Sequence, residues 1–188
     1  MREASVSLPL GIVIRKAPGV TRWASWSWKA VAVLPGAEDV HWRELRREGD
    51  AVEYHAATVP LELWPTDTEA YLNGLSAKTP AICVVLSATT DPNAAQEVEV
   101  LLATASPYEA QDYLDSGEEI VELVPMPEGL VAFIRDFVEQ HHEDEKFVKR
   151  KRDKQRVDLT DNGKGDPRIS QISNVYNPPR RATGETVH

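Results

Sequence analysis

The sequence predicts an α+β fold, in which a mainly antiparallel, strongly curled or barrel-like sheet is combined with two short helices and a long C-terminal helix. Three observations lead to this prediction. Strand-like segments dominate the first part of the chain, short helical segments interrupt them later, and one long amphipathic segment follows the last strand. Because strands come first and helices are few, neighbouring strands are expected to pair antiparallel.

Composition predicts one folded domain followed by a polar segment. The chain has 188 residues, of which 41% are hydrophobic, and this is enough for a single core. We expect the domain to span residues 1–152, including the C-terminal helix. Residues 153–188 hold few apolar side chains among Gly, Pro and Asn, so we expect them to form a disordered polar tail.

The chain is not expected to span a membrane. Its longest apolar run, near residues 81–86, has about six residues, whereas a spanning helix needs about 20. Cys83 lies in this run and is interpreted as a small buried side chain. A single cysteine forms no internal disulfide, which favours a reducing, cytoplasmic location.

The first two predicted strands cover Ser5–Arg15 and Trp23–Leu34, which are rich in β-branched or aromatic residues. The turn residues Ala17-Pro18-Gly19 lie between them, and Pro35-Gly36 ends the second. Successive side chains of a strand point to opposite faces. One face of the second strand therefore carries two indoles and three alanines: Trp26, Trp28, Ala24, Ala30 and Ala32.

A hairpin is predicted next, from Trp42–Arg47 and Ala51–Ala57, which are joined by a tight turn at Glu48-Gly49-Asp50. Leu61–Trp64 is interpreted as a separate short extended piece. Three later segments, bounded by turn or helix signals, are predicted as strands: Pro80–Ser87, Glu97–Ala103 and Glu119–Val124.

The helices are predicted from capping signals and periodicity. The first short helix covers Thr66–Leu75, where Thr66 as N-cap and Glu69 three residues later make a capping box. The second has Ser106 as N-cap, with proline and glutamate at its first and third positions, and runs to about residue 114. The long helix is predicted from Glu128 to about Arg152, because apolar residues recur there every three or four positions: Leu130, Val131, Ile134, Phe137 and Val138.

Charge is distributed unevenly along the chain. The net charge is −9, and residues 146–188 hold 11 basic and 5 acidic residues, or +6, so residues 1–145 carry −15. Nucleic-acid binding is not expected, because long-range repulsion would oppose contact between an acidic domain and a phosphate backbone. The basic run complements the dipole of the predicted helix or contacts an acidic protein surface or anionic ligand; it comprises Lys149, Arg150, Lys151 and Arg152.

The five tryptophans all lie between residues 23 and 64. Two interpretations are open: the indoles pack in the core, or they form an aromatic patch for a partner, since Trp is favoured at interface hot spots. The second interpretation defines a partner-binding set that also includes the basic run: Trp23, Trp26, Trp28, Trp42, Lys149, Arg150, Lys151 and Arg152.

The motifs of common chemistry do not occur in this sequence. It holds no nucleophile elbow, no phosphate-binding glycine loop and no pair of histidines four residues apart. We therefore predict no catalytic residues, no metal site and no cofactor. One weaker candidate is an anion site at Ser106 and Tyr108, because free N–H groups at a helix start attract anions, although the Ser106 hydroxyl is explained equally simply as a cap.

Several blocks resemble one known family. They are LPLGIVIRKAPGVTRWASWSWKAVAVLPG (residues 8–36), WRELRREGD (42–50), YHAATVPLELW (54–64), TASPYEAQDYLDSGEE (104–119) and FVKRKRD (147–153). Over roughly residues 5–155, the chain resembles the bacterial domain-of-unknown-function family 3305, whose genes lie beside those of molybdenum-dependent formate dehydrogenases. The family has no established catalytic residues to carry over.

The resemblance implies a non-enzymatic accessory protein that acts in maturation, assembly or stability of a molybdenum-dependent formate dehydrogenase. A subunit of that enzyme is then the expected partner. The alternative is a nucleotide- or anion-binding enzyme of molybdenum cofactor biosynthesis, whose site would lie at the Ser106 helix start.

Overall fold

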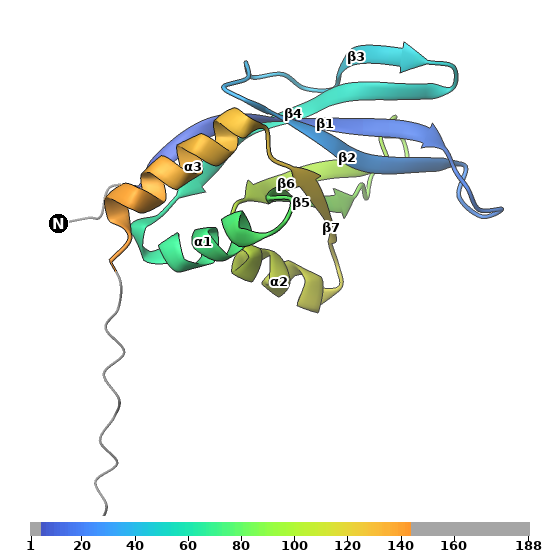
Figure 1. Cartoon of the computed structure of the whole chain (residues 1–188). Coiled ribbons are helices and arrows are strands. Elements are labelled where there is room, and N and C mark those ends of the chain that lie inside the picture. The colour runs from blue at the N-terminus through green and yellow to red at the C-terminus, as the bar shows by residue number, and fades with distance from the viewer. Residues whose placement is uncertain (1–4, 144–188) are drawn as a thin grey trace, which may run out of the picture. The chain divides into compact units, whose positions relative to one another are not determined.

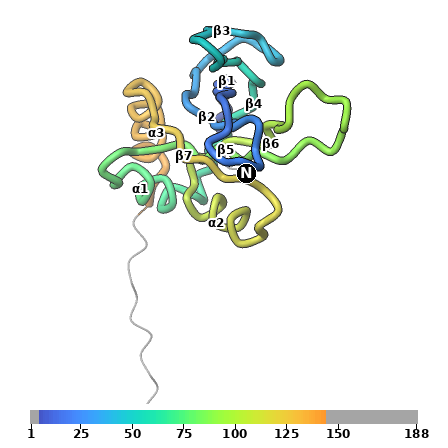
Figure 2. Tube along the Cα trace, turned by 90° about the vertical axis from the view of Figure 1, so that its right-hand side faces the viewer, coloured from blue at the N-terminus to red at the C-terminus, as the bar shows by residue number. Residues whose placement is uncertain are grey.

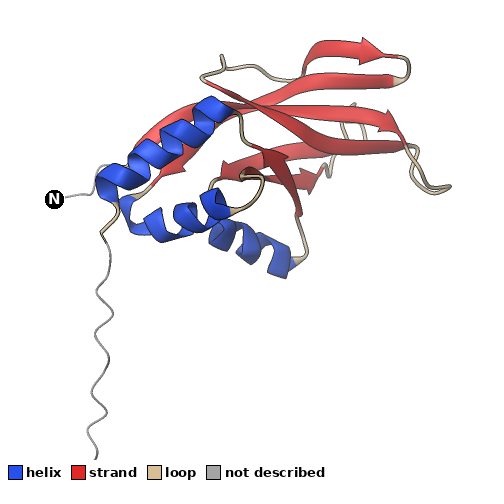
Figure 3. Cartoon of the chain, viewed as in Figure 1, coloured by secondary structure: helices blue, strands red, loops and turns tan. Residues whose placement is uncertain are grey.

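Seven strands form two separate antiparallel sheets in the computed structural model, which describes residues 5–143 (Figures 1 and 3). The first sheet has the order β2-β1-β4-β3 and the second the order β6-β5-β7. The strands of the first sheet are β1 (Val6–Pro18), β2 (Trp26–Pro35), β3 (Arg43–Glu48) and β4 (Ala51–Leu63). Those of the second are β5 (Ala81–Ala88), β6 (Val98–Thr104) and β7 (Ile120–Pro125).

The predicted α+β class and antiparallel pairing are confirmed, but the strongly curled or barrel-like sheet is wrong. Neither sheet closes on itself. A helical segment of η1 (Pro65–Asp67) and α1 (Thr68–Ser76) separates β4 from β5, so the chain starts a new sheet after it. The two open sheets bury their apolar faces against each other, which removes the need for closure.

The core lies between the two sheets and under α3 (Glu128–His141). Its fully buried side chains come from both layers: Leu10, Ile12, Ile14, Ile82, Val84, Leu86, Leu130 and Ile134. The opposite face of the second sheet is covered by α2 (Pro107–Ser116), which lies below β5 in Figure 2. Cys83 lies on that face and is buried, as predicted, and burial raises the pKa of its thiol.

The start of α1 corrects one prediction. Thr66 does not cap a helix; its hydroxyl donates to the Asp67 carboxylate at 3.2 Å, and no side chain caps α1. The physical reason is Pro65, which suits a first helical position and starts a 3₁₀ turn one residue before Thr66, so that Trp64 is the N-cap and Thr66 lies inside the turn. The capping box with Glu69 is therefore not formed.

The other two helices start as predicted. In α2, the Ser106 hydroxyl accepts the N–H of Glu109 at 3.2 Å, and Gly117 follows the helix with φ 69°, a left-handed conformation that glycine adopts at low cost. In α3, Glu128 begins the helix, but His142 is extended, so the helix ends at His141. The predicted continuation is wrong for 142–143, and its remainder up to Arg152, like the tail 153–188, lies outside the described residues.

Strand β4 is continuous through Pro60, so the prediction of Leu61–Trp64 as a separate extended piece is wrong. Pro60 lies directly opposite Pro9 of β1. The Pro9 carbonyl accepts the N–H of Gly36 at 2.8 Å, so it points away from β4. The backbone N and C=O of one residue in an antiparallel strand point to the same side, so the nitrogen of Pro9, which has no hydrogen to donate, also points away from β4. The paired prolines therefore remove no hydrogen bond between β1 and β4, and Leu61–Leu63 continues the strand.

The end of the β1–β2 hairpin also differs from the prediction. Strand β1 continues to Pro18, which pairs with Trp26, so the loop between the strands covers residues 19–25. Trp23 lies in that loop and not in a strand. A bulge at Val31 then reverses the side-chain alternation of β2. Trp26, Trp28 and Ala30 keep the predicted common face, whereas Ala32 points to the other one.

The connection from β2 to β3 crosses the outer face of the first sheet. Gly11 leaves the space for this crossing: a Cβ at that position would lie 2.6 Å from His55 Nε2 and 2.9 Å from Ala37 Cβ. The Thr58 hydroxyl donates to the Glu38 carbonyl at 2.6 Å, so it accepts the N–H of His55 Nε2 at 2.9 Å. The buried imidazole thus ties β4 to the crossing segment.

Replacing Gly11 by alanine is expected to lower the free energy of unfolding by about 1–3 kcal/mol, because the new methyl group overpacks His55 and Ala37. Urea denaturation followed by circular dichroism measures the change. Gly129→Ala is the control: nothing lies within 4 Å of its Cβ position in α3, and alanine favours a helix by up to about 1 kcal/mol. Equal effects of the two variants would contradict the close approach at Gly11.

None of the helices within residues 5–143 combines the length and the apolar character needed to cross a membrane.

Candidate partner-binding site

The loop between β1 and β2 presents two apolar side chains to solvent. Trp23 is 93% exposed and Val20 is 98% exposed. The loop is closed by a hydrogen bond from the Gly19 N–H to the Ser25 carbonyl at 3.1 Å. A Cβ on Gly19 would lie only 1.8 Å from the Ala24 carbonyl oxygen, so this closure requires glycine. We call residues 19–25 the hairpin tip.

Half-buried aromatic rings lie on the inner face of the first sheet behind the hairpin tip, and we call them the aromatic cluster: Trp26, Trp28, Trp42 and Tyr54. The Trp42 ring meets Trp28 and Tyr54 edge to face, each with ring centroids 5.8 Å apart. Lys16 Nζ lies 4.3 Å from the Trp26 ring centroid and 4.9 Å from that of Trp28, within the range of cation–π attraction.

The aromatic cluster is joined to both sheets. Trp28 Nε1 donates to a Glu97 carboxylate oxygen at 3.2 Å, just before β6. Trp28 and Trp42 also pack against the edge of the core. The sequence left core and interface as alternatives for the indoles, and the structure divides them: Trp28 and Trp42 extend the core to the surface, while Trp23 stands free of it.

Trp42 has an uncommon backbone conformation. Its φ is 48°, and it is the only non-glycine residue with positive φ among residues 5–143. Its N–H donates to the Ala56 carbonyl at 3.0 Å, which holds it beside β4. A bulky residue in this left-handed region costs about 1–2 kcal/mol, and such strained positions cluster at functional sites.

His55 gives this region a pH dependence. Burial, and secondarily the Arg43 charge, lower the pKa of His55 below its ordinary value of 6.5. Below about pH 6.5 the unfolded chain therefore binds more protons than the folded one. As the pH is lowered from 6.5, the free energy of unfolding should fall, until the pH is below the pKa of His55 in the folded state. Thermal unfolding between pH 5 and 7 measures this (roughly the range of histidine titration). In His55→Asn, which keeps a donor, the slope should flatten; an unchanged slope would contradict the assignment to His55.

Basic and acidic residues are unevenly distributed between the β1–β2 hairpin and the later elements of the described fold. Residues 4–37 contain four basic residues and no acidic one: Arg15, Lys16, Arg22 and Lys29. Residues 62–143 contain 16 acidic residues and only Lys78 and Arg135 as basic ones. The hairpin tip lies at the opposite end from α1 and α3 in Figure 1. The β1–β2 hairpin is therefore basic in itself, but carboxylates of other segments reach it: Glu53 lies 3.9 Å from Arg15, and Glu97 accepts from Trp28 Nε1.

The β1–β2 hairpin brings like charges together. Arg15 lies directly opposite Lys29 in the β1–β2 pairing, an arrangement that is unfavourable in a sheet. Arg15 is relieved by Glu53, whose carboxylate lies 3.9 Å away. Arg22 and Lys29 have no acidic partner within 4.0 Å among the described residues.

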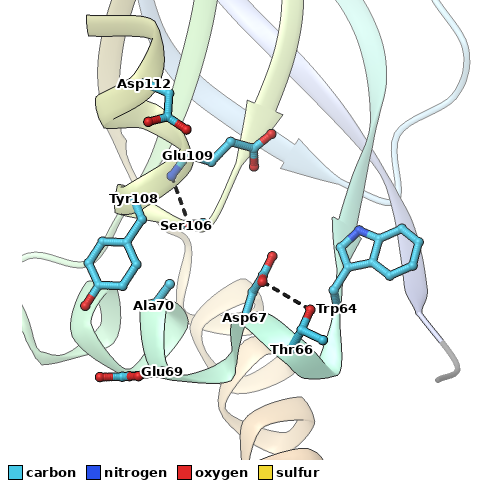
Figure 4. A pocket seen from close by; sticks show the side chains of 9 residues that line it. All are labelled: Trp64, Thr66, Asp67, Glu69, Ala70, Ser106, Tyr108, Glu109 and Asp112. Carbon is cyan, nitrogen blue, oxygen red and sulfur yellow. Dashed lines mark hydrogen bonds between the residues drawn. The ribbon is translucent and has the colours of Figure 1, made fainter. Parts of the chain in front are cut away.

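A second candidate region is a groove of about 510 Å³ that contains both predicted anion-binding residues (Figure 4). Ser106 and Tyr108 line it together with the partly exposed Trp64. Four carboxylates share the lining: Asp67, Glu69, Glu109 and Asp112. Their combined negative charge favours a cation over an anion in this groove.

The start of α2 offers few donors to an anion. Pro107 has no N–H, the Glu109 N–H is held by the Ser106 hydroxyl, and the Ala110 N–H bonds the Ser106 carbonyl at 3.2 Å. Only the Tyr108 amide is left in the first turn. The geometry therefore agrees with the capping interpretation of Ser106.

The structure brings most of the predicted aromatic set together, with Trp26, Trp28 and Trp42 close behind the hairpin tip that carries Trp23. Lys149, Arg150, Lys151 and Arg152 lie outside the described residues. Sequence reasoning missed Val20, Lys16 and Tyr54. Lys16 pairs with Trp28 in the β1–β2 register. The sequence prediction ended the first strand at Arg15 and placed the turn at Ala17-Pro18-Gly19, which is too early in the chain, so it did not give this pairing.

Comparison with protein families places the chain beside known sequences. A family model described as "Protein of unknown function (DUF3305)" matches residues 9–151. No curated protein matches the chain, and no solved structure does. Within residues 5–143, no three His, Cys, Asp or Glu side chains are grouped as ligands for a metal ion.

Proposed function

The chain belongs to the DUF3305 family, and we propose that it is a non-enzymatic accessory protein that docks on another protein through the hairpin tip and the aromatic cluster. Its role would lie in maturation, assembly or stability of a molybdenum-dependent formate dehydrogenase. That partner is taken from the family resemblance, whereas the mode of contact is argued from the geometry.

The observation that carries the docking proposal is the exposure of Trp23. An indole that is 93% exposed leaves nearly all of its large apolar surface in water, and burying it is favourable at about 25 cal/mol per Å². The loop behind it is closed by a hydrogen bond and by the close approach of Gly19 to Ala24. A preformed loop loses little entropy on binding, and tryptophan is the residue most enriched at interface hot spots.

Gene deletion tests the proposed role. Cells without the gene should show reduced formate oxidation and a reduced molybdenum content of the purified dehydrogenase. The wild-type gene should restore both, and a Trp23→Ala gene should not. Leu114→Ala, which removes a half-exposed leucine on α2, is the matched control and should restore both. Unchanged activity and metal content in the deletion strain would defeat the proposal.

The alternative, a nucleotide- or anion-binding enzyme of cofactor biosynthesis, has less support because four carboxylates line the groove at Ser106. Calorimetry of the full chain with GTP addresses it directly. Heat of binding that disappears in a Tyr108→Ala variant would favour the enzyme over the accessory protein.

A further inference from the structure

We infer that the partner meets the hairpin tip with an apolar pocket bordered by carboxylates, so that Trp23 and Val20 enter the pocket while the surrounding basic side chains face acidic ones. This inference deepens the proposed function and rests on it for the existence of a protein partner. It names the chemistry of the surface that the partner must offer.

The charge pattern carries the first step. Four basic residues and no acidic one occupy residues 4–37, in a chain whose residues 5–143 hold 22 acidic and 9 basic residues. Arg15 already has the Glu53 carboxylate 3.9 Å away, whereas Arg22 and Lys29 have no acidic partner within 4.0 Å among the described residues. Acidic groups on a partner would pair with these two cations, so they gain more here than at a neutral surface. Such complementarity also steers association and fixes orientation.

The spacing of apolar and basic groups carries the second step. Arg22 is adjacent to Trp23 in the loop, and Lys16 lies over Trp26 and Trp28 immediately behind it. One cation therefore lies against two of the indoles and another is next to Trp23, while the Glu97 carboxylate is bound by Trp28 Nε1. A pocket for the Trp23 ring would bring its own rim into contact with these cations, and a rim of carboxylates would form charge-assisted hydrogen bonds with them.

A protein pocket fits the hairpin tip better than an anionic membrane. Membrane binding grows with the number of buried CH₂ groups, and even a myristoyl chain alone binds marginally. Val20 and Trp23 are the two highly exposed apolar side chains in the tip, and together they offer less apolar insertion than such a chain. The half-buried rings behind them are fixed by Lys16, Trp42 and Glu97, which suits a shaped protein surface.

Site-specific photocrosslinking in the native cell tests the inference. The full chain carries p-benzoylphenylalanine in place of Trp23, and the crosslinked peptides are identified by mass spectrometry. We expect crosslinks to an apolar site on a protein whose nearest charged residues are Asp or Glu. Arg22→Glu should lower the crosslink yield by about tenfold, while Arg22→Lys should keep it. Arg135→Glu on α3 is the control for net charge and should have little effect.

The outcomes separate this inference from the proposed function. Crosslinks to an acidic pocket on a different protein would support the inference and remove the dehydrogenase as partner. Crosslinks to a neutral or basic surface of the dehydrogenase would overturn the inference and leave the proposed function standing. Absence of any crosslink at position 23 would overturn the inference. So would Trp23-dependent sedimentation of the purified chain with phosphatidylglycerol vesicles, since that would assign the hairpin tip to lipid.

Discussion

Replacing Trp23 by alanine should weaken binding to the partner by about 30-fold or more, because truncation of a hot-spot tryptophan costs at least about 2 kcal/mol. The same change should leave the free energy of unfolding nearly unchanged, since Trp23 is 93% exposed and packs against no core residue. Surface plasmon resonance with the purified dehydrogenase measures the affinity, and urea denaturation measures the stability.

Two comparisons sharpen this prediction. Leu114→Ala removes another half-exposed apolar side chain, on α2, and should change the affinity less than about twofold, the size of a residue outside a hot spot. In a separate measurement, raising the salt concentration should weaken binding of the wild-type protein to its partner, because salt screens the exposed basic groups near the hairpin tip. If Trp23→Ala and Leu114→Ala had equal effects, the contact would lie elsewhere on the molecule.

The sequence was informative where one local signal decides the structure. Ser106 predicted the start of α2, because its hydroxyl, the following proline and the glutamate at the third position all act within one turn. The alternation of Trp26 and Trp28 gave their common face for the same reason. Antiparallel pairing followed from the order of strands. These features depend on neighbours in the chain and need no knowledge of distant contacts.

Features that depend on distant segments were missed. The continuity of β4 through Pro60 is understandable only once Pro9 is known to lie opposite it. The bulge at Val31 depends on register with β1, and two sheets in place of one curled sheet depend on how apolar faces meet. In the groove at Ser106, the acidic lining brings together carboxylates of η1 and α1 with those of α2, about 40 residues later in the sequence.

The second prediction with a large effect concerns the contribution of Trp42 to stability. Trp42→Ala should lower the free energy of unfolding by about 2–4 kcal/mol, somewhat less than for a fully buried tryptophan, because it removes the edge contacts with Trp28 and Tyr54. Trp42→Gly removes the same contacts, yet it should be about 1 kcal/mol more stable than Trp42→Ala. At φ 48° glycine is free of the steric cost that alanine retains. Urea denaturation of both variants gives the difference.

The sign of that difference is diagnostic, because glycine normally destabilises relative to alanine through the entropy of the unfolded chain. Trp64 provides the control site: its φ of −113° and ψ of 135° are extended, so Trp64→Gly should be less stable than Trp64→Ala. If glycine were also the worse residue at position 42, no strain would be stored there. Trp42 would then be held by packing alone, and its backbone would give no reason to link the aromatic cluster with function.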